Sequence, residues 1–567
     1  MSRTEVDIRE RAGSHAATIG EQFALAEAAH GDRRALRSAG TGPDRPCDWL
    51  TFSEVARLAG AAVAQLVERG AAFGDRVVLA LPNSVILRIL DRAVLGSGLV
   101  RVALSPRLHP REIADIALDC GARAVCCSPG AVGEIHAALT AVGSAAAVIG
   151  CADEAPHHGR PSATLTPGSL ATSPPSASVT PALVPSPPTA PRTGAPWPAP
   201  APSDIAMLMY SSGTTGRPKG AVVTHGTWVA QTRRALRELP PTGPGDVVLA
   251  VAPMSHFGGS IGLDCAVSGA ATVTMPQFEP RAVLEAVERY GVTVLPLAPI
   301  MLERLARAAV GPAGPLRGVR AVPYGGSPIG ADSLALAERL FPGALSQFYG
   351  LAEALAPLTV LSPADHASGA AGRLASAGRV SAGVELRLVD GEIVVRSDTV
   401  MTGYWNRPEL TAAVLSDGWF RTGDLAHLDA DGYVHLNGRS SDLIVTGGFN
   451  VHPAEVERVI AGVAGIRDVA VVGLPHPVWG EGVTAAVVLD ADRATDSAAS
   501  ADSTDSADAP DAPGEAILAA ITRACAAAIA SYKKPVAVHR VPEIPRNAAG
   551  KTDRRTLRHL LSDREEH

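Results

Sequence analysis

Apolar residues recur with two different spacings along the first part of the chain. In the stretch 51–70, TFSEVARLAGAAVAQLVERG, they return every three or four positions, which predicts an amphipathic helix opened by Thr51 or Ser53. DRVVLALPN (75–83) and ARAVCCS (122–128) are short continuous apolar runs typical of buried strands, and a helical stretch lies between them. Strands that alternate with helices favour a parallel α/β sheet.

The same alternation returns after residue 204 and changes character near residue 385. RAVLEAVERYG (281–291) predicts a helix that leads into a strand over VTVLPLAP (292–299). Beyond it, short β segments predict two hairpins, with turns at Asp390-Gly391 and Asp431-Gly432. The pattern then becomes strand, helix, two strands and a helix, so we expect a domain boundary near 438–442.

Two segments interrupt these patterns. Residues 155–203 are rich in proline, serine, alanine and threonine without periodicity, and residues 490–515 are acidic and rich in small residues. Neither composition buries enough apolar area to order itself, so both segments predict disordered insertions that act as spacers. The N-terminal domain then covers 1–438 with the first insertion, and the C-terminal domain covers 439–567 with the second.

Composition narrows the class of protein. The chain has 567 residues, a formal net charge of −7 and 46% hydrophobic residues, which permits a large core. The acidic balance argues against a nucleic-acid-binding protein, which usually carries a basic patch. No apolar run is long enough to predict a membrane span, and the charged N-terminus lacks the apolar stretch of a secretion signal. The seven cysteines contain no C-x-x-C pair, which favours reduced thiols in a cytoplasmic protein.

The strongest chemical signal is YSSGTTGRPKG (210–220), which runs straight into the apolar stretch AVVTH. Its glycines let backbone N–H groups converge on an anion, and its hydroxyls and Lys219 add donors and positive charge. A plain flexible turn would rarely assemble this density of donors. It is not a Walker A loop, because no Gly-Lys-Ser/Thr follows at the required spacing. We interpret the motif as a phosphate-binding loop.

This motif resembles the phosphate-binding signature of the adenylate-forming superfamily, which includes acyl-CoA synthetases, aryl-CoA ligases, carrier-protein adenylation domains and luciferases. Further segments resemble that family's motifs in the same order: QFYGLAE (347–353), GWFRTGD (418–424), GRSSD (438–442) with GGFNVHPAEVE (447–457), and PRNAAGK (545–551). The resemblance covers nearly the whole chain outside the two insertions.

The resemblance implies an α/β fold with a large N-terminal domain and a small mobile α+β C-terminal domain. The large domain would contain αβ-layered sheets plus a distorted β-barrel. The implied reaction has two halves on one site. A carboxylate attacks the α-phosphate of ATP to give an acyl-adenylate and pyrophosphate, and a thiol, usually that of CoA, then displaces AMP. ATP, Mg²⁺ and CoA are therefore the expected cofactors, since two reacting anions need charge neutralisation.

The resemblance also assigns roles to individual residues. Glu353 is expected to bind Mg²⁺, because a hard cation prefers carboxylate and phosphate oxygens. Asp424 is expected to accept both ribose hydroxyls, and Tyr349 to stack on the adenine. The residues implied to contact ATP or CoA are Ser211, Ser212, Gly213, Thr214, Thr215, Gly216, Lys219, Gly325, Gly326, Ser327, Tyr349, Gly350, Asp424, Arg439 and Gly448.

Three residues of the C-terminal region carry roles tied to domain movement. In the family the small domain swings about the domain junction, where Asp442 is the expected hinge. Lys551 is expected to place its charge between the attacking carboxylate and the α-phosphate, and Gly448 to leave room for a pantetheine arm. Lys533 and Lys534 are expected to be surface charges.

The acid-binding pocket is implied by APMSHFGGSI (252–261), which matches a pocket wall in related ligases. His256 is expected to gate the pocket or to neighbour the substrate carboxylate, and we group it with Lys551 and Glu353 as catalytic. No aspartate lies where amino-acid-activating relatives hold an α-amino group, which disfavours an α-amino acid. The expected pocket residues are His256, Phe257, Gly258, Ala298, Tyr324, Leu351 and Ala352.

Ala352 departs from the family pattern, because a threonine hydroxyl that donates to the α-phosphate usually stands there. The leading interpretation is a cytoplasmic acid–CoA ligase for an aryl or alkyl acid. The alternatives are an adenylate-forming enzyme with a carrier-protein thiol, another nucleophile or nitrite as substrate, and a nucleotide-binding pseudoenzyme. The expected partners are a small carboxylic acid and CoA or a carrier protein, without nucleic acid, and homodimerisation stays open.

Overall fold

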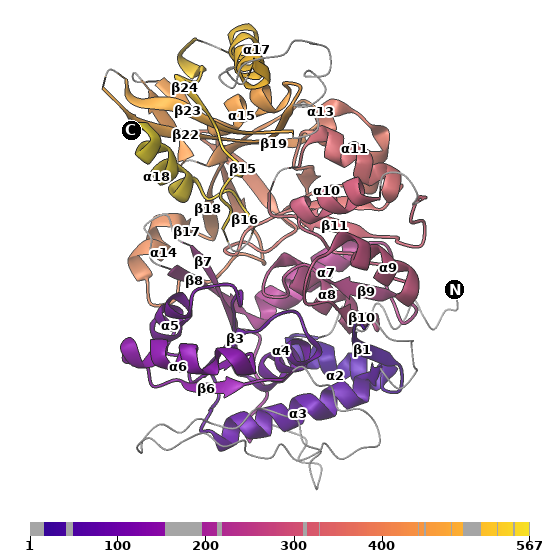
Figure 1. The fold of residues 1–567 in the computed structure, drawn as a ribbon. Helices are drawn as coiled ribbons and strands as arrows, with labels where there is room; N and C mark the ends of the chain where they lie inside the picture. The colour runs from indigo at the N-terminus through magenta and orange to yellow at the C-terminus, as the bar shows by residue number, and fades with distance from the viewer. Residues whose placement is uncertain are drawn as a thin grey trace, which may run out of the picture. The chain divides into compact units, whose positions relative to one another are not determined.

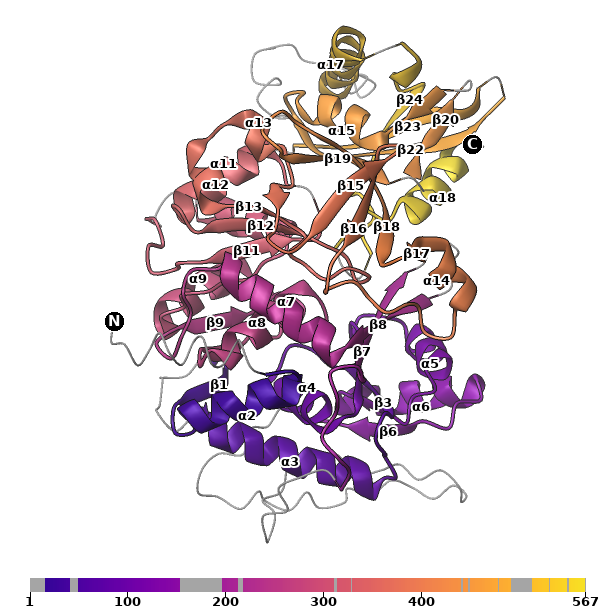
Figure 2. The ribbon, with the colours of Figure 1, turned by 180° about the vertical axis from the view of Figure 1, so that it is seen from behind.

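The chain divides by its internal contacts into two compact units, shown in a computed structural model (Figures 1 and 2). The first comprises Met1–Leu386 and Val395–Phe420, and the second comprises Arg387–Val394 and Arg421–His567. The boundary near 438–442 stays a prediction. The structure describes residues 16–40, 49–152, 196–212, 218–309, 314–327, 329–439, 442–446, 449–477, 479–490, 512–529, 531–547 and 550–565.

The first unit contains a six-stranded sheet with the strand order β6–β5–β3–β4–β7–β8. Neighbouring strands within the sheet are parallel, except for the antiparallel pair β7–β8, so the predicted parallel α/β sheet is confirmed. The strands are β3 (Arg76–Ala80), β4 (Val100–Ala103), β5 (Ala124–Cys127), β6 (Ala147–Gly150), β7 (Ile205–Ser212) and β8 (Pro218–Thr224).

Helices cover both faces of this sheet, as Figure 1 shows. Cys126 faces a core shared with α3 and α4, while the next residue, Cys127, faces a core shared with α5 and α6. Successive side chains of a strand point to opposite faces, which explains why these strands are apolar throughout. The helices are α3 (Phe52–Glu68), α4 (Val85–Ser97), α5 (Pro110–Asp119) and α6 (Val132–Ala141), with a short 3-10 turn at Pro129–Ala131.

Helix α3 begins where the sequence indicated. The Thr51 hydroxyl accepts from the Glu54 N–H, and the Glu54 carboxylate accepts from the Thr51 N–H, so Thr51 rather than Ser53 is the N-cap. Helix α4 is capped by Ser84 and ends at Gly98, whose φ of 84° is left-handed.

A second sheet of this unit has the order β2–β1–β10–β9, and a third has the order β11–β12–β13–β14. Their strands are β1 (Arg34–Ser38), β2 (Leu50–Thr51), β9 (Val247–Ala250), β10 (Ala271–Thr274), β11 (Val322–Gly325), β12 (Leu345–Tyr349), β13 (Thr359–Leu361) and β14 (Arg379–Val380). The accompanying helices are α2 (Ile19–His30), α7 (His225–Glu238), α8 (Phe257–Val267), α9 (Pro280–Tyr290), α10 (Pro299–Ala308), α11 (Ala331–Leu340), α12 (Pro363–Ser368), α13 (Ala371–Leu374) and α14 (Pro408–Val414).

The predicted strand over 292–299 is wrong. Only isolated bridges form there, from Val294 to Val248 and Ala321, and from Leu297 to Tyr324. Pro296 lies between the two bridging residues, and a proline has no N–H to donate to a ladder.

The two predicted hairpins are present in a five-stranded sheet with the order β15–β16–β18–β17 and β19 beside β18. Asp390 and Gly391 have φ values of 53° and 79°, and Gly432 has 81°, as tight hairpin turns require. The strands are β15 (Glu385–Val389), β16 (Glu392–Arg396), β17 (Leu415–Ser416), β18 (Trp419–Leu428) and β19 (Val434–Arg439).

The second unit contains a sheet with the order β21–β20–β23–β22 and β24 beside β23. Its strands are β20 (Ile444–Thr446), β21 (Phe449–Val451), β22 (Ile466–His476), β23 (Gly480–Leu489) and β24 (Ala537–Arg540). Its helices are α15 (Pro453–Ala461), α17 (Ala512–Ala528) and α18 (Arg554–Glu565), with a 3-10 turn at Ser531–Lys533. The predicted α/β fold class with a separate α+β C-terminal region is confirmed.

Of the predicted insertions at 155–203 and 490–515, residues 155–195 and 491–511 lie outside the described residues, and helix α17 begins at Ala512 within the second. Trp197, near the end of the first segment, packs against the core of α3 and α4 and donates its indole N–H to the Ser97 carbonyl at 2.5 Å. Six cysteines are free thiols, all of them buried. Within the described part of the chain, no helix is long and apolar enough to cross a membrane.

His225, the first residue of α7, makes the stability of the first unit depend on pH. Its side chain is fully buried, and within the described residues neither ring nitrogen has a hydrogen-bond partner. Burial lowers the pKa of the ring from 6.5 to about 4, although the charge of Asp204 opposes this shift. The unfolded chain therefore binds a proton near pH 6.5 that the folded chain takes up only near pH 4.

We predict that His225→Leu removes this dependence. Wild type should lose about 3 kcal/mol of unfolding free energy relative to the variant as pH falls from 6.5 to about 4. Urea unfolding of both proteins across that range measures the difference. His559→Leu, at an exposed position, is the control. Parallel pH profiles for wild type and His225→Leu would contradict the prediction.

Candidate active site

Three side chains far apart in the sequence meet in the first unit. Lys219 Nζ lies 3.3 Å from Glu353 Oε1 and donates to the Tyr404 hydroxyl at 2.6 Å. The Tyr404 hydroxyl in turn donates to Glu353 Oε1 at 3.0 Å. Lys219 Nζ also lies 4.4 Å from the centre of the Tyr404 ring, within range of a cation–π interaction. Lys219 and Glu353, both predicted from motifs, are thus brought together by a residue that the sequence did not single out.

Backbone pairing explains why Tyr404 stands beside Lys219. Tyr404 forms an antiparallel bridge with Ala221, the Val222 N–H donates to the Gly403 carbonyl at 2.9 Å, and the Trp405 N–H donates to the Gly220 carbonyl at 2.8 Å. Residues 402–405 therefore run along β8 at the end of the phosphate-motif segment.

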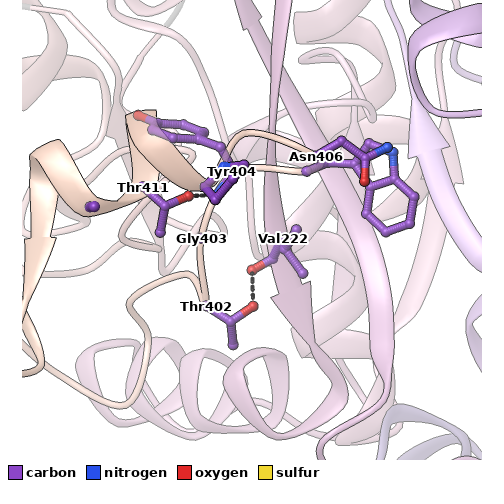
Figure 3. A pocket seen from close by; sticks show the side chains of 9 residues that line it. Val222, Thr402, Gly403, Tyr404, Asn406 and Thr411 are labelled. Carbon is purple, nitrogen blue, oxygen red and sulfur yellow. Dashed lines mark hydrogen bonds between the residues drawn. The ribbon is translucent and has the colours of Figure 1, made fainter.

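A pocket beside this pairing is shown in Figure 3. On its wall the Tyr404 N–H donates to the Thr411 hydroxyl at 2.9 Å, and the Thr402 hydroxyl donates to the Val222 carbonyl at 3.4 Å. These bonds fix the backbone on both sides of Tyr404, so its phenol is aimed by the main chain. The pocket is lined by Val222, Thr402, Gly403, Tyr404, Trp405, Asn406, Pro408, Thr411 and Ala412.

Glu353 has the surroundings of a carboxylate that can take a divalent cation together with phosphates. Its residue is 8% exposed, and its backbone carbonyl accepts from the Met401 N–H at 2.8 Å. Among the described residues, both side-chain contacts fall on Oε1, so Oε2 keeps its accepting capacity. Mg²⁺ commonly takes one or two carboxylates and completes its shell with phosphate oxygens and water. Glu353 therefore fits a Mg²⁺ ligand beside ATP.

The predicted adenine-side residues gather at the ends of the neighbouring parallel strands β11 and β12. A Cβ on Gly325 would lie 2.2 Å from the Phe348 carbonyl oxygen, so only glycine fits between the strands. Gly326 has a φ of 97°, and a Cβ there would meet nothing within 4 Å, so its backbone faces open space. Ser327 and Gly350 are half-buried and Tyr349 is 9% exposed.

Part of the phosphate motif cannot be placed. Gly213, Thr214, Thr215 and Gly216 lie outside the described residues, as do the side chains of Ser211 and Ser212. Gly448 also lies outside them.

Asp424 and Arg439, both predicted from motifs, form a pair in the second unit. They are opposite residues in the antiparallel ladder of β18 and β19, and Arg439 Nε lies 2.9 Å from Asp424 Oδ1. Asp424 is 7% exposed, and its N–H donates to the Thr422 hydroxyl at 3.1 Å. The pair offers a carboxylate and an adjacent guanidinium, which together suit a ribose and its phosphate.

Lys551 lies at the end of a closed loop in the same unit. The Asn547 N–H donates to the Lys551 carbonyl at 2.8 Å, and the Lys551 N–H donates to Asn547 Oδ1 at 3.0 Å. Arg546 anchors this loop to Asp468, with 2.7 Å between Arg546 Nη2 and Asp468 Oδ2. The Lys551 residue is exposed.

Asp442, the predicted hinge, lies 3.4 Å from Arg554 Nη1, and Arg554 also pairs with Glu457 at 2.6 Å. Lys533 forms an ion pair with Glu455 in the same unit.

The predicted acid-pocket residues begin at the N-terminus of α8. His256 is the N-cap of this helix, and its Nδ1 lies 2.8 Å from the Ser255 hydroxyl. The Phe257 ring packs edge-on against Phe348, with 5.9 Å between ring centres. A Cβ on Gly258 would lie 2.5 Å from the Ala252 Cβ, so this glycine lies tightly against the preceding segment.

The other predicted pocket residues differ in exposure. Ala298, Leu351 and Ala352 are half-buried. Tyr324 is fully buried, and its hydroxyl lies 2.8 Å from His366 Nε2 and donates to Gln347 Oε1 at 3.2 Å. Burial raises the pKa of the Tyr324 phenol well above its usual value, so it stays neutral.

The chain is similar along much of its length to known proteins. Feruloyl-CoA synthase from an Amycolatopsis species is 36% identical over 364 residues, which are 61% of this chain and 68% of the relative. The long-chain-fatty-acid–CoA ligase FadD13 of Mycobacterium tuberculosis is 29% identical over 90% of this chain and 93% of its own. The amide bond synthetase McbA from Marinactinospora thermotolerans superposes with a TM-score of 0.75 at 28% identity, over 96% of this chain and 99% of its own.

The family match and the fold together define an adenylate-forming enzyme, which confirms the resemblance seen in the sequence. The AMP-binding enzyme family matches residues 23–405, and its C-terminal domain family matches residues 455–551. The chain belongs to the AMP-binding enzyme family.

We predict that Tyr404→Phe weakens MgATP binding. The change keeps the ring over Lys219 but removes the hydroxyl that bridges Lys219 and Glu353. A hydrogen bond to a charged group contributes about 1.5–3 kcal/mol, and solvent returns part of it, so affinity should fall about tenfold. Calorimetric titration with MgATP measures the loss.

Tyr290→Phe is the matched control, because Tyr290 is also buried and its hydroxyl accepts from the Gly40 N–H at 3.0 Å, outside the cluster. An equal loss of MgATP affinity in both variants would show that the Tyr404 hydroxyl has no particular role at this site.

Proposed function

We propose that the protein is an AMP-forming acid–CoA ligase that activates an aryl or alkyl carboxylic acid. The observation that carries the proposal is the cluster of Lys219 and Glu353 around the Tyr404 hydroxyl at the end of the phosphate motif. The cluster offers a cation for phosphate oxygens and a carboxylate for Mg²⁺ within one hydrogen-bonded group. A nucleotide pseudoenzyme has no need to keep both.

The proposed reaction has two balanced steps. One oxygen of the acid attacks the α-phosphorus of ATP, the bond from that phosphorus to the oxygen shared with the β-phosphate breaks, and pyrophosphate leaves. The CoA thiol then gives its proton to solvent, its sulfur attacks the acyl carbon, and the bond from that carbon to the phosphate oxygen of AMP breaks, which releases AMP. Lys219 and Glu353 with Mg²⁺ would neutralise charge in the first step, when two anions approach each other. Asp424 and Arg439 would hold the ribose and its phosphate.

Relatives support an acid–CoA ligase without fixing the acid. One is named for a feruloyl product, which carries an aromatic ring, and another for long-chain fatty acids. The half-buried small residues Ala298 and Ala352 and the close-packed Gly258 leave either class possible on size alone.

A second acceptor class is favoured by one comparison. McbA, with a TM-score of 0.75, is named an amide bond synthetase, so an amine in place of the CoA thiol is the second candidate. A carrier-protein thiol is the third. The test is a pyrophosphate-release screen over aryl and alkyl acids, followed by AMP release with CoA, with amines, or with neither. If acids cause pyrophosphate release but CoA does not increase AMP release, the proposal of a CoA ligase is rejected. The conclusion that the protein adenylates an acid would still hold.

Lys551→Ala should abolish adenylation and spare thioester formation. Removing one donor that stabilises developing charge typically costs about 10²–10³ in rate. Acid-dependent pyrophosphate release should fall by at least that factor, while conversion of a supplied acyl-adenylate and CoA to acyl-CoA should stay within about threefold of wild type.

Lys534→Ala is the control for Lys551→Ala, since it also removes one lysine charge from the second unit. It should leave both half-reactions unchanged. Equal losses of the two half-reactions in Lys551→Ala would contradict the assigned role.

Ala352→Thr should raise adenylation several-fold at most. The new hydroxyl can donate to the α-phosphate, which carries more charge in the transition state than in ground-state ATP. A hydrogen bond to a charged group contributes about 1.5–3 kcal/mol, but a site adapted to alanine should regain only part of it. Steady-state pyrophosphate release with one acid gives kcat/KM for both proteins. A tenfold fall with unchanged ATP affinity would indicate instead that the acid or acceptor needs the space beside Ala352.

A further inference from the structure

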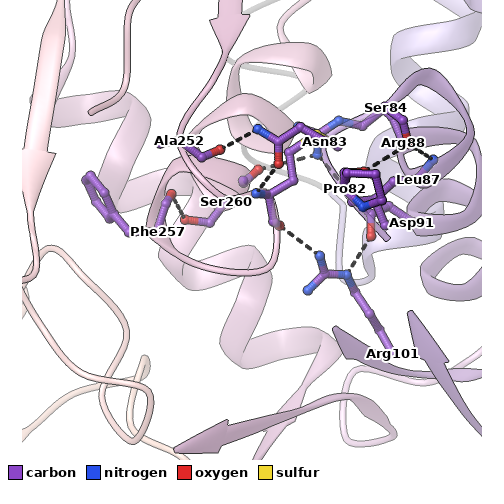
Figure 4. A network of polar contacts seen from close by, with 12 residues as sticks. Pro82, Asn83, Ser84, Leu87, Arg88, Asp91, Arg101, Ala252, Phe257 and Ser260 are labelled. Atoms are coloured by element: carbon purple, nitrogen blue, oxygen red, sulfur yellow. Dashed lines mark hydrogen bonds and ion pairs between the residues drawn. The ribbon is translucent and has the colours of Figure 1, made fainter. Parts of the chain in front are cut away.

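Asn83 ties two distant parts of the first unit together through three hydrogen bonds (Figure 4). Its Nδ2 donates to the Ala250 carbonyl at 3.1 Å and to the Ala252 carbonyl at 2.9 Å. Its Oδ1 accepts from the Met254 N–H at 2.9 Å. Asn83 lies between β3 and α4 and is 7% exposed, whereas its partners run from Ala250, the last residue of β9, to Met254. One buried amide therefore fixes the main chain at three points between the end of β9 and Met254.

An ion pair holds Met254 through its carbonyl group. Arg101 Nη2 donates to the Met254 carbonyl at 3.0 Å, and Arg101 Nε lies 2.6 Å from Asp91 Oδ1. Asp91 is fully buried, so its charge requires this partner. The main chain of Met254 is thus held through its N–H by Asn83 and through its carbonyl by Arg101.

Arg88 extends the network to the start of α8. Its Nη1 lies 3.4 Å from Asp91 Oδ2 and 3.4 Å from the Gly259 carbonyl oxygen. A Cβ on Gly259 would lie 2.0 Å from the Met254 carbonyl oxygen. Segment 250–259 is therefore folded back tightly on itself, and the network holds it at both ends.

This segment carries His256, Phe257 and Gly258, which belong to the proposed acid pocket. We propose that Asn83 and the Arg101–Asp91 pair are positioning residues that set which acid the enzyme prefers. The inference rests on the proposed function. Asn83 acts only through the backbone of residues 250–254, so it is not a catalytic residue.

The physical reason is that the position of the proposed pocket wall depends on hydrogen bonds to the Asn83 side chain. Removing the Asn83 amide leaves the Ala252 carbonyl and the Met254 N–H without the partner that they have in the structure, whereas the Ala250 carbonyl keeps the Met275 N–H at 3.1 Å. The segment must then shift to satisfy the two orphaned groups. A displacement of about 1 Å near a reacting centre can cost on the order of 10² in rate. Because MgATP contacts come from other segments, the loss should fall on the acid.

The test compares wild type, Asn83→Ala and Arg101→Lys over a series of alkyl acids of rising length and a series of aryl acids. The ratio of kcat/KM between the best aryl and the best alkyl acid should change about tenfold or more in Asn83→Ala, since the pocket wall has moved. KM for MgATP should stay within about threefold. Arg101→Lys keeps a cation for Asp91 and should change the ratio less, and it serves as the second variant where Asn83→Ala does not fold.

Leu139→Ala is the matched control for lost stability. Leu139 is buried in α6, in a core separate from the one that contains Ala250 and Met254. This variant should lower the melting temperature and leave the acid ratio unchanged.

A second readout does not depend on catalysis. Hydrogen exchange of the peptide that contains Met254 should be about tenfold faster in Asn83→Ala than in wild type, and unchanged in Leu139→Ala. Unchanged exchange would overturn the positioning role. Faster exchange with an unchanged acid ratio would overturn the role in acid preference. Failure of the proposed function is distinct, because wild type itself would then release no pyrophosphate with any acid of the series.

Discussion

A carboxylate that leaves water has to find a positive or hydrogen-bonding partner, and the functional parts of this protein are arranged around that requirement. The effective cost of burying an unpaired ion is several kcal/mol, a large share of a typical domain's stability. Asp91, Glu353 and Asp424 are all less than one-tenth exposed, and each lies against a basic side chain from a different part of the chain. The pairs join α4 to β4, the segment after β12 to β8, and β18 to β19. The positions of the site segments therefore follow from charge pairing as much as from apolar packing.

Much of the fold could be predicted from signals that lie close together in the sequence. The Thr51 cap of α3 and the hairpin turns at Asp390-Gly391 and Asp431-Gly432 each depend on residues within a few positions of one another, so the sequence sufficed to find them. The strand expected at 292–299 shows where such signals mislead. Its β-branched and leucine residues are typical of a strand, but prolines remove donors, and the segment only bridges neighbouring strands.

The sequence predicted those site residues that lie in recognisable motifs and missed those that lie outside them. Motif residues could be named without any geometry, and the structure brings four of them together in two pairs that were not predicted: Lys219 with Glu353, and Asp424 with Arg439. Tyr404 and Asn83 were missed because their partners lie 185 and 51 positions away for Tyr404, and 167 to 171 positions away for Asn83. Nothing near either residue in the sequence marks such a partner. Only the pairing of backbone segments brings them into place.

The way Met254 is held also separates two properties that often change together, the position of a chain segment and the chemistry of its side chains. Its N–H and carbonyl are held by Asn83 and Arg101, so main-chain atoms set the place of the proposed pocket wall, while the side chains at 256 and 257 would set its chemistry. A lineage, or a combinatorial library, can vary those two side chains without disturbing the attachment of the loop. Gly259 is the opposite case, since any side chain there would collide with the Met254 carbonyl. Substitutions are therefore compatible with the attachment of this loop at positions 256 and 257, whereas position 259 has to remain glycine.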